Sequence, residues 1–392
     1  MKKSILTSCL VFAMVLLSSL ALSLPAFAAN AGSQQAPAAR SARAFKNACA
    51  QARKGRASCL ALVSTTTVLK PNGKALGAHP NASSPGGSAP YSPANLAAAY
   101  NLPTNAGTSQ TVAIVDAQDD PNAEADMNTY RSQFGLPACT SSSGCFSKVD
   151  QNGGTNYPAA DGGWAEEISL DLDMVSAICN NCHILLVEAN SASFSDLGQA
   201  ENTAASLGAN EISNSYGGGE SSGDSSTCNS YYNHSGVVIT ASSGDGGLGV
   251  ESPADCGNVV GVGGTTLNSD GSETAWSSAG GGCSSYIGEP SWENSGVTNC
   301  GNRAVSDVSA DADPNTGVYV YDTYQQGGWL QVGGTSASSP IIASVYALAG
   351  GGSNDAASIP WGRYTSGCLN QVGGQTYQYQ AGLGSPNGTG CF

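Results

Sequence analysis

Histidine is scarce in this chain, with three among 392 residues. His79 lies in a segment rich in Ala, Ser and Pro, His183 opens an apolar run, and His234 follows Tyr-Tyr-Asn in a polar loop sequence. We expect His183 to be structural, and none of the three has a setting typical of a catalytic base. A hydrolase that depends on His183 or His234 stays open as an alternative, but a nucleophile in this chain is expected to use a carboxylate as its base.

Charged residues are also scarce, at 11% of the chain, and positive ones nearly disappear after residue 88. Residues 30–88 contain eight Lys or Arg and no Asp or Glu, whereas residues 89–392 contain four Lys or Arg and all 29 carboxylates. An acidic body repels phosphates, so nucleic acid is not an expected partner. The asymmetry favours docking of the basic segment 29–88 on the body, although a solvated linker is equally consistent with it.

The same imbalance predicts tolerance of acid. Acid unfolding is driven largely by changes of charge on titrating groups. At low pH most of the 29 carboxylates are neutral, and few positive charges remain to repel one another. The body is therefore expected to be suited to acidic conditions.

Long apolar runs are absent except near the N-terminus. Lys2-Lys3, an apolar run ending at Leu24 and the small-residue pattern Ala26-Phe27-Ala28 predict a secretory signal peptide over residues 1–28. No later stretch approaches the ~20 apolar residues that cross a bilayer. We therefore expect a secreted, extracellular monomer without membrane association.

Thirteen cysteines are present, and one of them, Cys9, lies in the predicted signal peptide. The remaining twelve predict up to six disulfides in an exported protein. The sequence does not fix their connectivity. Pairs that are close or plausible in sequence are Cys49/Cys59, Cys139/Cys145, Cys179/Cys182, Cys283/Cys300 and Cys368/Cys391.

From residue 89 onward, short apolar runs alternate with helical patterns. Uninterrupted apolar strands that alternate with helices predict an α/β fold of three layers, with a mostly parallel central sheet and helices on both faces. The active site of such a sheet lies beyond the carboxyl ends of its strands. Residues 29–88 are a short basic prosegment or linker, in which 59–63 is the one expected strand. The expected strands of the main domain are 111–115, 183–187, 211–216, 237–241 and 259–262, and the expected helices are 92–100, 164–178, 194–207 and one after residue 336.

The candidate nucleophile is Ser336, in the stretch Gly-Gly-Thr-Ser-Ala-Ser-Ser-Pro that ends at Pro340. An apolar run to Ala349 follows and predicts a buried helix. We expect Pro340 in its first turn, where a missing N–H costs little. Ser336 would then lie at the positive end of the helix dipole, which favours the negative charge that develops during attack on a carbonyl. The alternative is a Gly-Ser loop that only caps the helix.

The expected helix 164–178 supplies the candidate base. Glu167 and Asp171 are four residues apart and share one face. Two buried carboxyl groups on one face cannot both ionise easily, so they would titrate as a pair. A Glu beside a protonated Asp remains usable as a base in acid, where a histidine is already charged. Glu166 and Asp173 form a rival face, and a solvated acidic face is the non-catalytic alternative.

Asp245 follows the end of the strand 237–241 and lies between glycines, in Ser-Gly-Asp-Gly. A residue at that place points into the expected site. If protonated, its carboxyl group can donate a hydrogen bond to a developing oxyanion. An ordinary turn is the alternative interpretation.

Together these motifs resemble the sedolisins, the serine-carboxyl peptidases with a subtilisin-like fold. The resemblance covers roughly residues 89–350 and also explains Asp116, which ends a strand as the first-strand Asp of subtilisins does but is not the catalytic partner in sedolisins. It implies a secreted, acid-active endopeptidase that hydrolyses proteins or peptides through an acyl-enzyme. By resemblance, the catalytic residues are Ser336 as nucleophile, Glu167 as base, Asp171 as its orienting partner and Asp245 as oxyanion donor.

The resemblance also assigns substrate binding and exposes two departures. Residues 213–219 are similar to the strand that pairs with the substrate backbone, which implicates Ser215, Tyr216, Gly217 and Gly218. Sedolisins bind calcium near the C-terminus through an Asp, but Arg363 stands at the matching place and no Asp or Glu follows Asp355. We therefore expect no metal and no cofactor.

The second departure is the prosegment, which is much shorter than the folded prodomain of the family. Its role in inhibition or folding is left open by the sequence. A catalytically silent secreted protein that keeps the fold for binding or structure is the rival prediction.

Overall fold

Eight strands form the main sheet in the computed structural model, which describes residues 45–66, 70–71, 89–103, 109–351 and 355–392. The predicted signal peptide lies outside these residues. Seven strands run parallel, in the order β15, β11, β9, β7, β4, β6, β5, and β12 pairs with β11 in the antiparallel sense. Their bounds are β4 (Thr111–Ala117), β5 (Phe146–Asp150), β6 (His183–Ala189), β7 (Glu211–Asn214), β9 (Val238–Ser242), β11 (Val260–Leu267), β12 (Glu273–Ala275) and β15 (Val308–Asp311).

Both faces of this sheet are covered by helices, as the alternation along β4 shows. Val112 and Ile114 pack with residues of α3 (Gly162–Ile178) and α7 (Thr335–Ala349). Ala113 and Val115 point to the other face and pack with α4 (Phe194–Ser206). Successive side chains of a strand face opposite sides, so an uninterrupted apolar strand requires two cores. The predicted α/β architecture is thereby confirmed.

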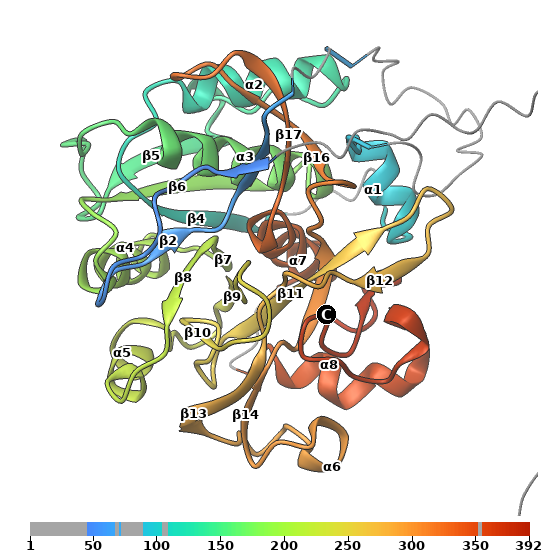
Figure 1. The fold of residues 1–392 in the computed structure, drawn as a ribbon. Helices are drawn as coiled ribbons and strands as arrows, with labels where there is room; N and C mark the ends of the chain where they lie inside the picture. The colour runs from blue at the N-terminus through green and yellow to red at the C-terminus, as the bar shows by residue number, and fades with distance from the viewer. Residues whose placement is uncertain (1–44, 67–69, 72–88, 104–108, 352–354) are drawn as a thin grey trace, which may run out of the picture. The chain divides into compact units, whose positions relative to one another are not determined.

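The other elements surround this core (Figure 1). The remaining helices are α1 (Pro93–Ala99), α2 (Ala123–Gln133), α5 (Asp224–Tyr231), α6 (Ser295–Thr298) and α8 (Ser358–Arg363), with 3-10 turns at Ser141–Ser143, Tyr364–Ser366 and Val372–Gly374. One smaller sheet joins β1 (Phe45–Asn47), β3 (Leu62–Ser64), β17 (Gly328–Gly333) and β16 (Val318–Asp322); another joins β10 (Glu251–Ser252), β8 (Tyr216–Gly219) and β2 (Ser58–Cys59). Two-stranded pairs are β13 (Gly282–Gly288) with β14 (Asn302–Val305) and β18 (Leu369–Asn370) with β19 (Ser385–Pro386).

Two predictions about local structure need correction. The strand expected over 211–216 is interrupted at Ser215, where the chain leaves the main sheet as β7 and continues as β8. Pro340 was expected in the first turn of its helix, but α7 begins at Thr335, so the proline lies inside the helix. The helix starts earlier because Gly334, at φ 100°, adopts a conformation that permits a sharp turn out of β17.

Six disulfides hold the described chain. The five pairs expected from the sequence are all formed, and the sixth joins Cys228 at α5 to Cys256. Within the described residues, none of the helices combines the length and apolar character that crossing a bilayer requires.

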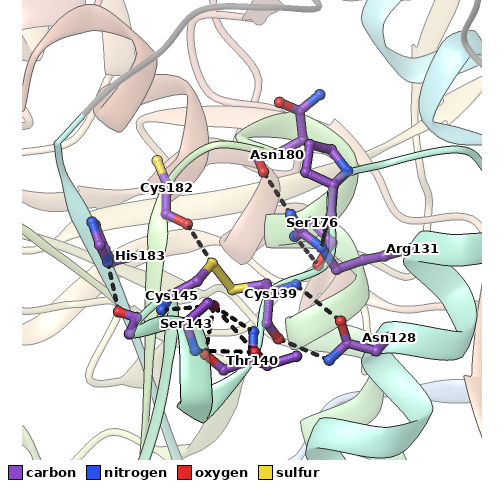
Figure 2. Close-up of a disulfide and its surroundings, with 12 residues drawn as sticks. Asn128, Arg131, Cys139, Thr140, Ser143, Cys145, Ser176, Asn180, Cys182 and His183 are labelled. Carbon is purple, nitrogen blue, oxygen red and sulfur yellow. Dashed lines mark hydrogen bonds between the residues drawn. A yellow bond between two sulfur atoms is a disulfide. The ribbon is translucent and has the colours of Figure 1, made fainter.

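The short loop closed by Cys139–Cys145 lies beside a buried arginine (Figure 2). Arg131 of α2 donates to Ser176 Oγ of α3 at 2.9 Å and to the carbonyl of Asn180 at 2.6 Å. These bonds fasten α2 to the C-terminal end of α3. They satisfy a guanidinium group that is only 1% exposed, so the orientation of α3, which carries the candidate base, is fixed at this end.

Candidate active site

The candidate nucleophile lies where β17 turns into α7. Gly334 makes the turn, and Ser336 is in the first turn of the helix with a fully buried side chain. The parallel strand β9 ends nearby, since Ser242 Oγ at its end donates to the carbonyl of Thr335 at 2.8 Å. Ser336 therefore lies at the carboxyl ends of the parallel strands, where the sequence predicted the site.

The hydroxyl of Ser336 has three polar neighbours. It donates to the carbonyl of Ser215 at 3.2 Å, and it accepts from the backbone N–H of Leu60 at 3.2 Å. The same Leu60 N–H lies 3.1 Å from Glu167 Oε2, so the Ser336 hydroxyl and the Glu167 carboxyl group share one backbone donor. The serine and the candidate base are therefore within reach of one another.

The structure separates the two acidic faces of α3. Glu167 and Asp171 face the serine, and Asp171 Oδ1 accepts from Ser215 Oγ at 2.7 Å. Glu166 instead accepts from Gln326 Nε2 at 3.1 Å, and Asp173 accepts from the Tyr321 N–H at 2.9 Å. The rival pair therefore faces β16 and the loop after it, away from the serine.

Three fully buried carboxyl groups meet beneath the serine, with Asp116 added to the pair that the sequence singled out. Burial, and then Asp171, raise the pKa of Glu167 well above its ordinary value, while burial and Asp116 raise the pKa of Asp171. Burial, followed by Glu167 and Glu188, raises the pKa of Asp116.

The hydrogen bonding of these carboxyl groups also indicates that some of them are protonated. Glu167 Oε1, Asp171 Oδ2 and both oxygens of Asp116 have no donor among the described groups. Buried oxygens almost always have a hydrogen-bond partner. Protons held or shared by the carboxyl groups themselves would satisfy these oxygens, so the cluster is built to carry fewer charges than it has carboxyl groups.

Asp245 contacts Thr335, the residue between Gly334 and Ser336. Its Oδ1 accepts from the N–H and the hydroxyl of Thr335, at 2.8 and 2.9 Å. Its Oδ2 has no partner in the described structure, and burial raises its pKa to about 8. A Cβ atom added to Gly334 would lie 2.6 Å from this oxygen and would overlap the carbonyl oxygen of Leu60. The free oxygen and the Leu60 carbonyl therefore flank the same small space, which only a glycine leaves open.

The predicted substrate-binding residues are occupied by the chain itself. Ser58 and Cys59 pair with Gly217 and Tyr216 of β8 in an antiparallel ladder. Only the backbone of Tyr216 takes part in this ladder. Its ring is buried, and its hydroxyl donates to Asn214 Oδ1 at 2.6 Å. In Figure 1 the blue segment runs beside β8.

The sequence did not lead us to expect this occupancy. The strand expected over 59–63 is instead two short strands, β2 and β3, on either side of Leu60 and Ala61, and the carbonyl of Arg56 lies against Gly218. The buried positions Ala57, Cys59, Ala61 and Val63 alternate along the segment, and this alternation was the available signal.

The described histidines lie away from the serine. His183 begins β6, where its Nδ1 bonds the carbonyl of Gly144 at 3.0 Å beside the loop of Figure 2. It pairs with Thr111 at the start of β4, five residues of strand, roughly 16 Å, before Asp116. His234 precedes the start of β9 and bonds the carbonyl of Tyr231. His79 lies outside the described residues.

One trio in the described chain has the spacing of a metal site: Cys228, Asp255 and Cys256. The two cysteines are joined in a disulfide, so they have no thiolate to offer a metal. This trio is therefore not a candidate metal centre.

The chain is similar to known peptidases in sequence. Residues 153–361 match the model of the Subtilase family. Sedolisin from Pseudomonas sp. (strain 101) is 29% identical over 199 residues, which are 40% of this chain and 33% of that protein. Xanthomonalisin from Xanthomonas sp. (strain T-22) is 29% identical over 174 residues, 36% of this chain and 21% of that protein. The matched regions thus span a third or less of these relatives.

A solved structure of Pseudomonas sedolisin, a serine-carboxyl proteinase complexed with two molecules of pseudo-iodotyrostatin, is similar in fold. Its TM-score is 0.63 at 26% sequence identity, and the match covers 76% of this chain and 95% of that chain. The sedolisin resemblance drawn from the motifs agrees with these matches.

Proposed function

The chain belongs to the subtilase family, and on that premise we propose that it is a secreted serine-carboxyl endopeptidase that cleaves proteins or peptides in acid. One observation supports this most strongly. The Ser336 hydroxyl and the Glu167 carboxyl group contact the same Leu60 N–H, and Glu167 belongs to a buried carboxyl cluster in which four of the six oxygens lack donors. Among the described residues, no histidine lies near the serine to act as its base.

In the proposed mechanism, Ser336 Oγ attacks the carbonyl carbon of the substrate and passes its proton to Glu167. The amine leaves after taking a proton from Glu167, and water then hydrolyses the acyl-enzyme by the reverse sequence. Asp171 holds a proton that allows a single negative charge to reside on Glu167. The neighbours raise the pKa of Glu167 only while they are charged, so the first ionisation of the cluster is the easiest one.

Asp245 is proposed to stabilise the oxyanion. Below about pH 8 its carboxyl group is mostly protonated, because burial raises its pKa to about 8. Thr335 occupies Oδ1, which leaves the Oδ2 hydroxyl to donate to a carbonyl oxygen beside Gly334. Such a donor acts where charge develops in the transition state.

We also propose that the calcium site of sedolisins is lost here. Arg363 stands at the place of the expected Asp, and its guanidinium donates to the carbonyl of Gly390 at 2.9 Å. No Asp or Glu follows Asp355. Calcium binds through oxygen ligands that normally include carboxylates, so this donor set does not fit the ion.

The test is digestion of casein at about pH 3–5, with Ser336→Ala as the control. The proposal expects digestion by the wild type and none by the variant. A wild-type protein that cleaves nothing across this range contradicts it and favours the rival, a silent secreted protein that uses the fold for binding. The secretion part is tested separately, by N-terminal sequencing of protein recovered from the culture medium.

A further inference from the structure

Residues 56–64 lie across the candidate active site in an extended conformation. On the N-terminal side, Ser58 and Cys59 form the ladder with β8, and the Leu60 N–H extends it by donating to the Ser215 carbonyl at 3.3 Å. On the C-terminal side, Leu62 and Val63 pair with Gly333 and Val332 of β17. The two ladders are separated by Leu60 and Ala61.

The peptide group between these ladders meets the reactive groups. The Leu60 N–H lies 3.2 Å from Ser336 Oγ, and the Leu60 carbonyl oxygen lies against Gly334, next to the free oxygen of Asp245. The residue before the Leu60–Ala61 bond thus has its N–H at the nucleophile and its carbonyl oxygen beside an acid donor. A peptide bond that is about to be attacked by the serine is held in this way.

We propose that Leu60–Ala61 is the first peptide bond that Ser336 cleaves, in its own chain. The inference rests on the proposed function, because it needs an active serine. It assigns a processing site within the segment 29–88, makes Ala61 the N-terminus of the processed enzyme, and identifies the position of Leu60 as the subsite that selects the residue before the cleaved bond.

The step balances with water as the one co-reactant. Ser336 Oγ bonds to the Leu60 carbonyl carbon while its proton moves to Glu167. The carbon–nitrogen bond to Ala61 breaks, and the departing nitrogen takes that proton as an amine. Water then adds to the ester, giving the Leu60 carboxylic acid and restoring the Ser336 hydroxyl.

Both sides of the bond are held after it breaks. Before it, the Cys49–Cys59 disulfide closes a loop whose end is the β2 strand. On the C-terminal side of the bond, β3 lies between β17 and β1. Its Val63 pairs with Lys46 of β1, which belongs to the N-terminal side. An amine kept in place can attack the ester again and re-form the bond. The segment therefore acts as a slowly released inhibitor of the site that cleaves it.

Its binding does not depend on ion pairs to the exposed arginines and lysine. Arg53, Lys54 and Arg56 take part in none of the ion pairs found in the described chain. The contacts are backbone ladders and the buried side chains of Ala57, Cys59, Ala61 and Val63, although the charge of Lys46 does stabilise the Glu166 carboxylate. The charge attraction expected from the sequence stays a prediction.

The test uses full-length protein brought to about pH 4, followed by intact mass and N-terminal sequencing over time. Wild type should yield a product that begins at Ala61, and Ser336→Ala should stay uncut. Leu60→Asp should slow the cut at least about 100-fold, because it adds a carboxyl group at the residue whose N–H contacts Glu167 and whose carbonyl oxygen lies beside Asp245. Gln51→Asp adds the same side chain at an exposed place in the segment and should be cut at the wild-type rate.

Casein digestion is measured on the same samples to separate the two failures. A protein that digests casein but is cut elsewhere, or not at all between residues 60 and 61, overturns this inference and leaves the proposed function standing. An equal rate for Leu60→Asp and wild type overturns it as well. A protein that cleaves neither casein nor itself overturns the proposed function, and the inference with it.

Retention of the fragment is tested by gel filtration at about pH 6 after the cut. The wild-type fragment ending at Leu60 should remain with the enzyme. The double variant Cys49→Ser/Cys59→Ser should release it, whereas Cys368→Ser/Cys391→Ser, which removes a disulfide near the C-terminus, should keep it. Equal release from wild type and the first double variant contradicts the bracing role of the disulfide.

Discussion

Pro340 stands four residues after Ser336 inside α7 and leaves the Ser336 carbonyl without its helical hydrogen bond. That carbonyl instead accepts from Ser215 Oγ at 3.2 Å, and the same hydroxyl group lies 2.7 Å from Asp171 Oδ1. The proline inside the helix therefore leaves the carbonyl of the candidate nucleophile free to contact Ser215, whose side chain connects it to the buried carboxyl cluster.

Ser215→Ala should lower kcat by about 10–100-fold with little change in KM. It removes the polar link between Asp171 and the Ser336 backbone, so Asp171 loses the hydrogen bond that lowers its pKa. The variant should also shift the acid limb of the pH–kcat profile, which a purely structural role would not move. Stopped assays at several pH values with a peptide substrate measure both effects.

Ser213→Ala is the matched control, because Ser213 Oγ bonds Ser339 Oγ of the same helix at 2.9 Å without touching the carboxyl groups. Its pH profile should match that of the wild type. If the two variants behave alike, the link through Ser215 has no special part in catalysis.

Asp245→Ala should reduce kcat about 10²–10³-fold at acidic pH, because a donor to the oxyanion is lost. Asp245→Asn keeps an acceptor for Thr335 and an amide donor that does not titrate. The wild type loses its donor as the pH rises through about 8, since that is the raised pKa of Asp245. The ratio of kcat/KM for Asp245→Asn to that of wild type should therefore increase with pH; a constant ratio speaks against the donor role.

The folded protein should be most stable in acid and lose stability as the pH rises from about 4 to about 8. Burial raises the pKa of Asp245, Glu166 and Glu188 to about 8. The folded state then holds protons that the unfolded chain, with carboxyl pKa values of about 4, has already released. Each raised group contributes stability below pH 4 that disappears as the pH rises through its folded pKa.

Calorimetry of the Ser336→Ala variant, which avoids self-digestion, measures this trend. A domain of this size loses roughly 2–4 °C of Tm for each kcal/mol. A Tm that rises toward neutral pH would show that these carboxyl groups are charged in the folded state.

Arg303→Met should cost about 3–5 kcal/mol of stability, because it leaves buried carboxylates without their cation. The guanidinium is fully buried and donates to Asp307 Oδ1 at 2.7 Å and to Glu293 Oε2 at 3.2 Å. Arg363→Met removes an exposed arginine that bonds one backbone carbonyl and should cost under about 1 kcal/mol. Urea unfolding of both variants in the Ser336→Ala background measures the two losses of unfolding free energy. Similar losses would show that the buried ion pairs of Arg303 add no special stability.

The sequence was sufficient for the layers of the fold and for the location of the serine. Apolar runs such as the one over 111–115 fix which strands are buried on both sides, and a helix that follows two glycines fixes where a parallel sheet presents its nucleophile. The spacing of Glu167 and Asp171 placed them on one face, but it placed Glu166 and Asp173 on another equally well. The choice depends on which face of α3 meets α7, which is a tertiary contact.

Other features had no local signal. The position of Pro340 depends on where the helix begins, which Gly334 decides through its φ of 100°. The pairing of Cys228 with Cys256 joins residues that are 28 positions apart. The segment around Leu60 has the alternation of one continuous strand, and this alternation does not show that two different sheets hold its two halves.

If a carboxyl group performs the proton transfer for Ser336, as proposed, the pH dependence of kcat/KM must report the ionisation of that group and not of a histidine. Processed wild type, Glu167→Gln and the double variant His183→Gln/His234→Gln are compared with one peptide substrate. We predict an optimum below about pH 5, a loss of at least about 10³-fold for Glu167→Gln, and an unchanged profile for the histidine variant. An optimum near neutral pH that disappears in the histidine variant would contradict the account.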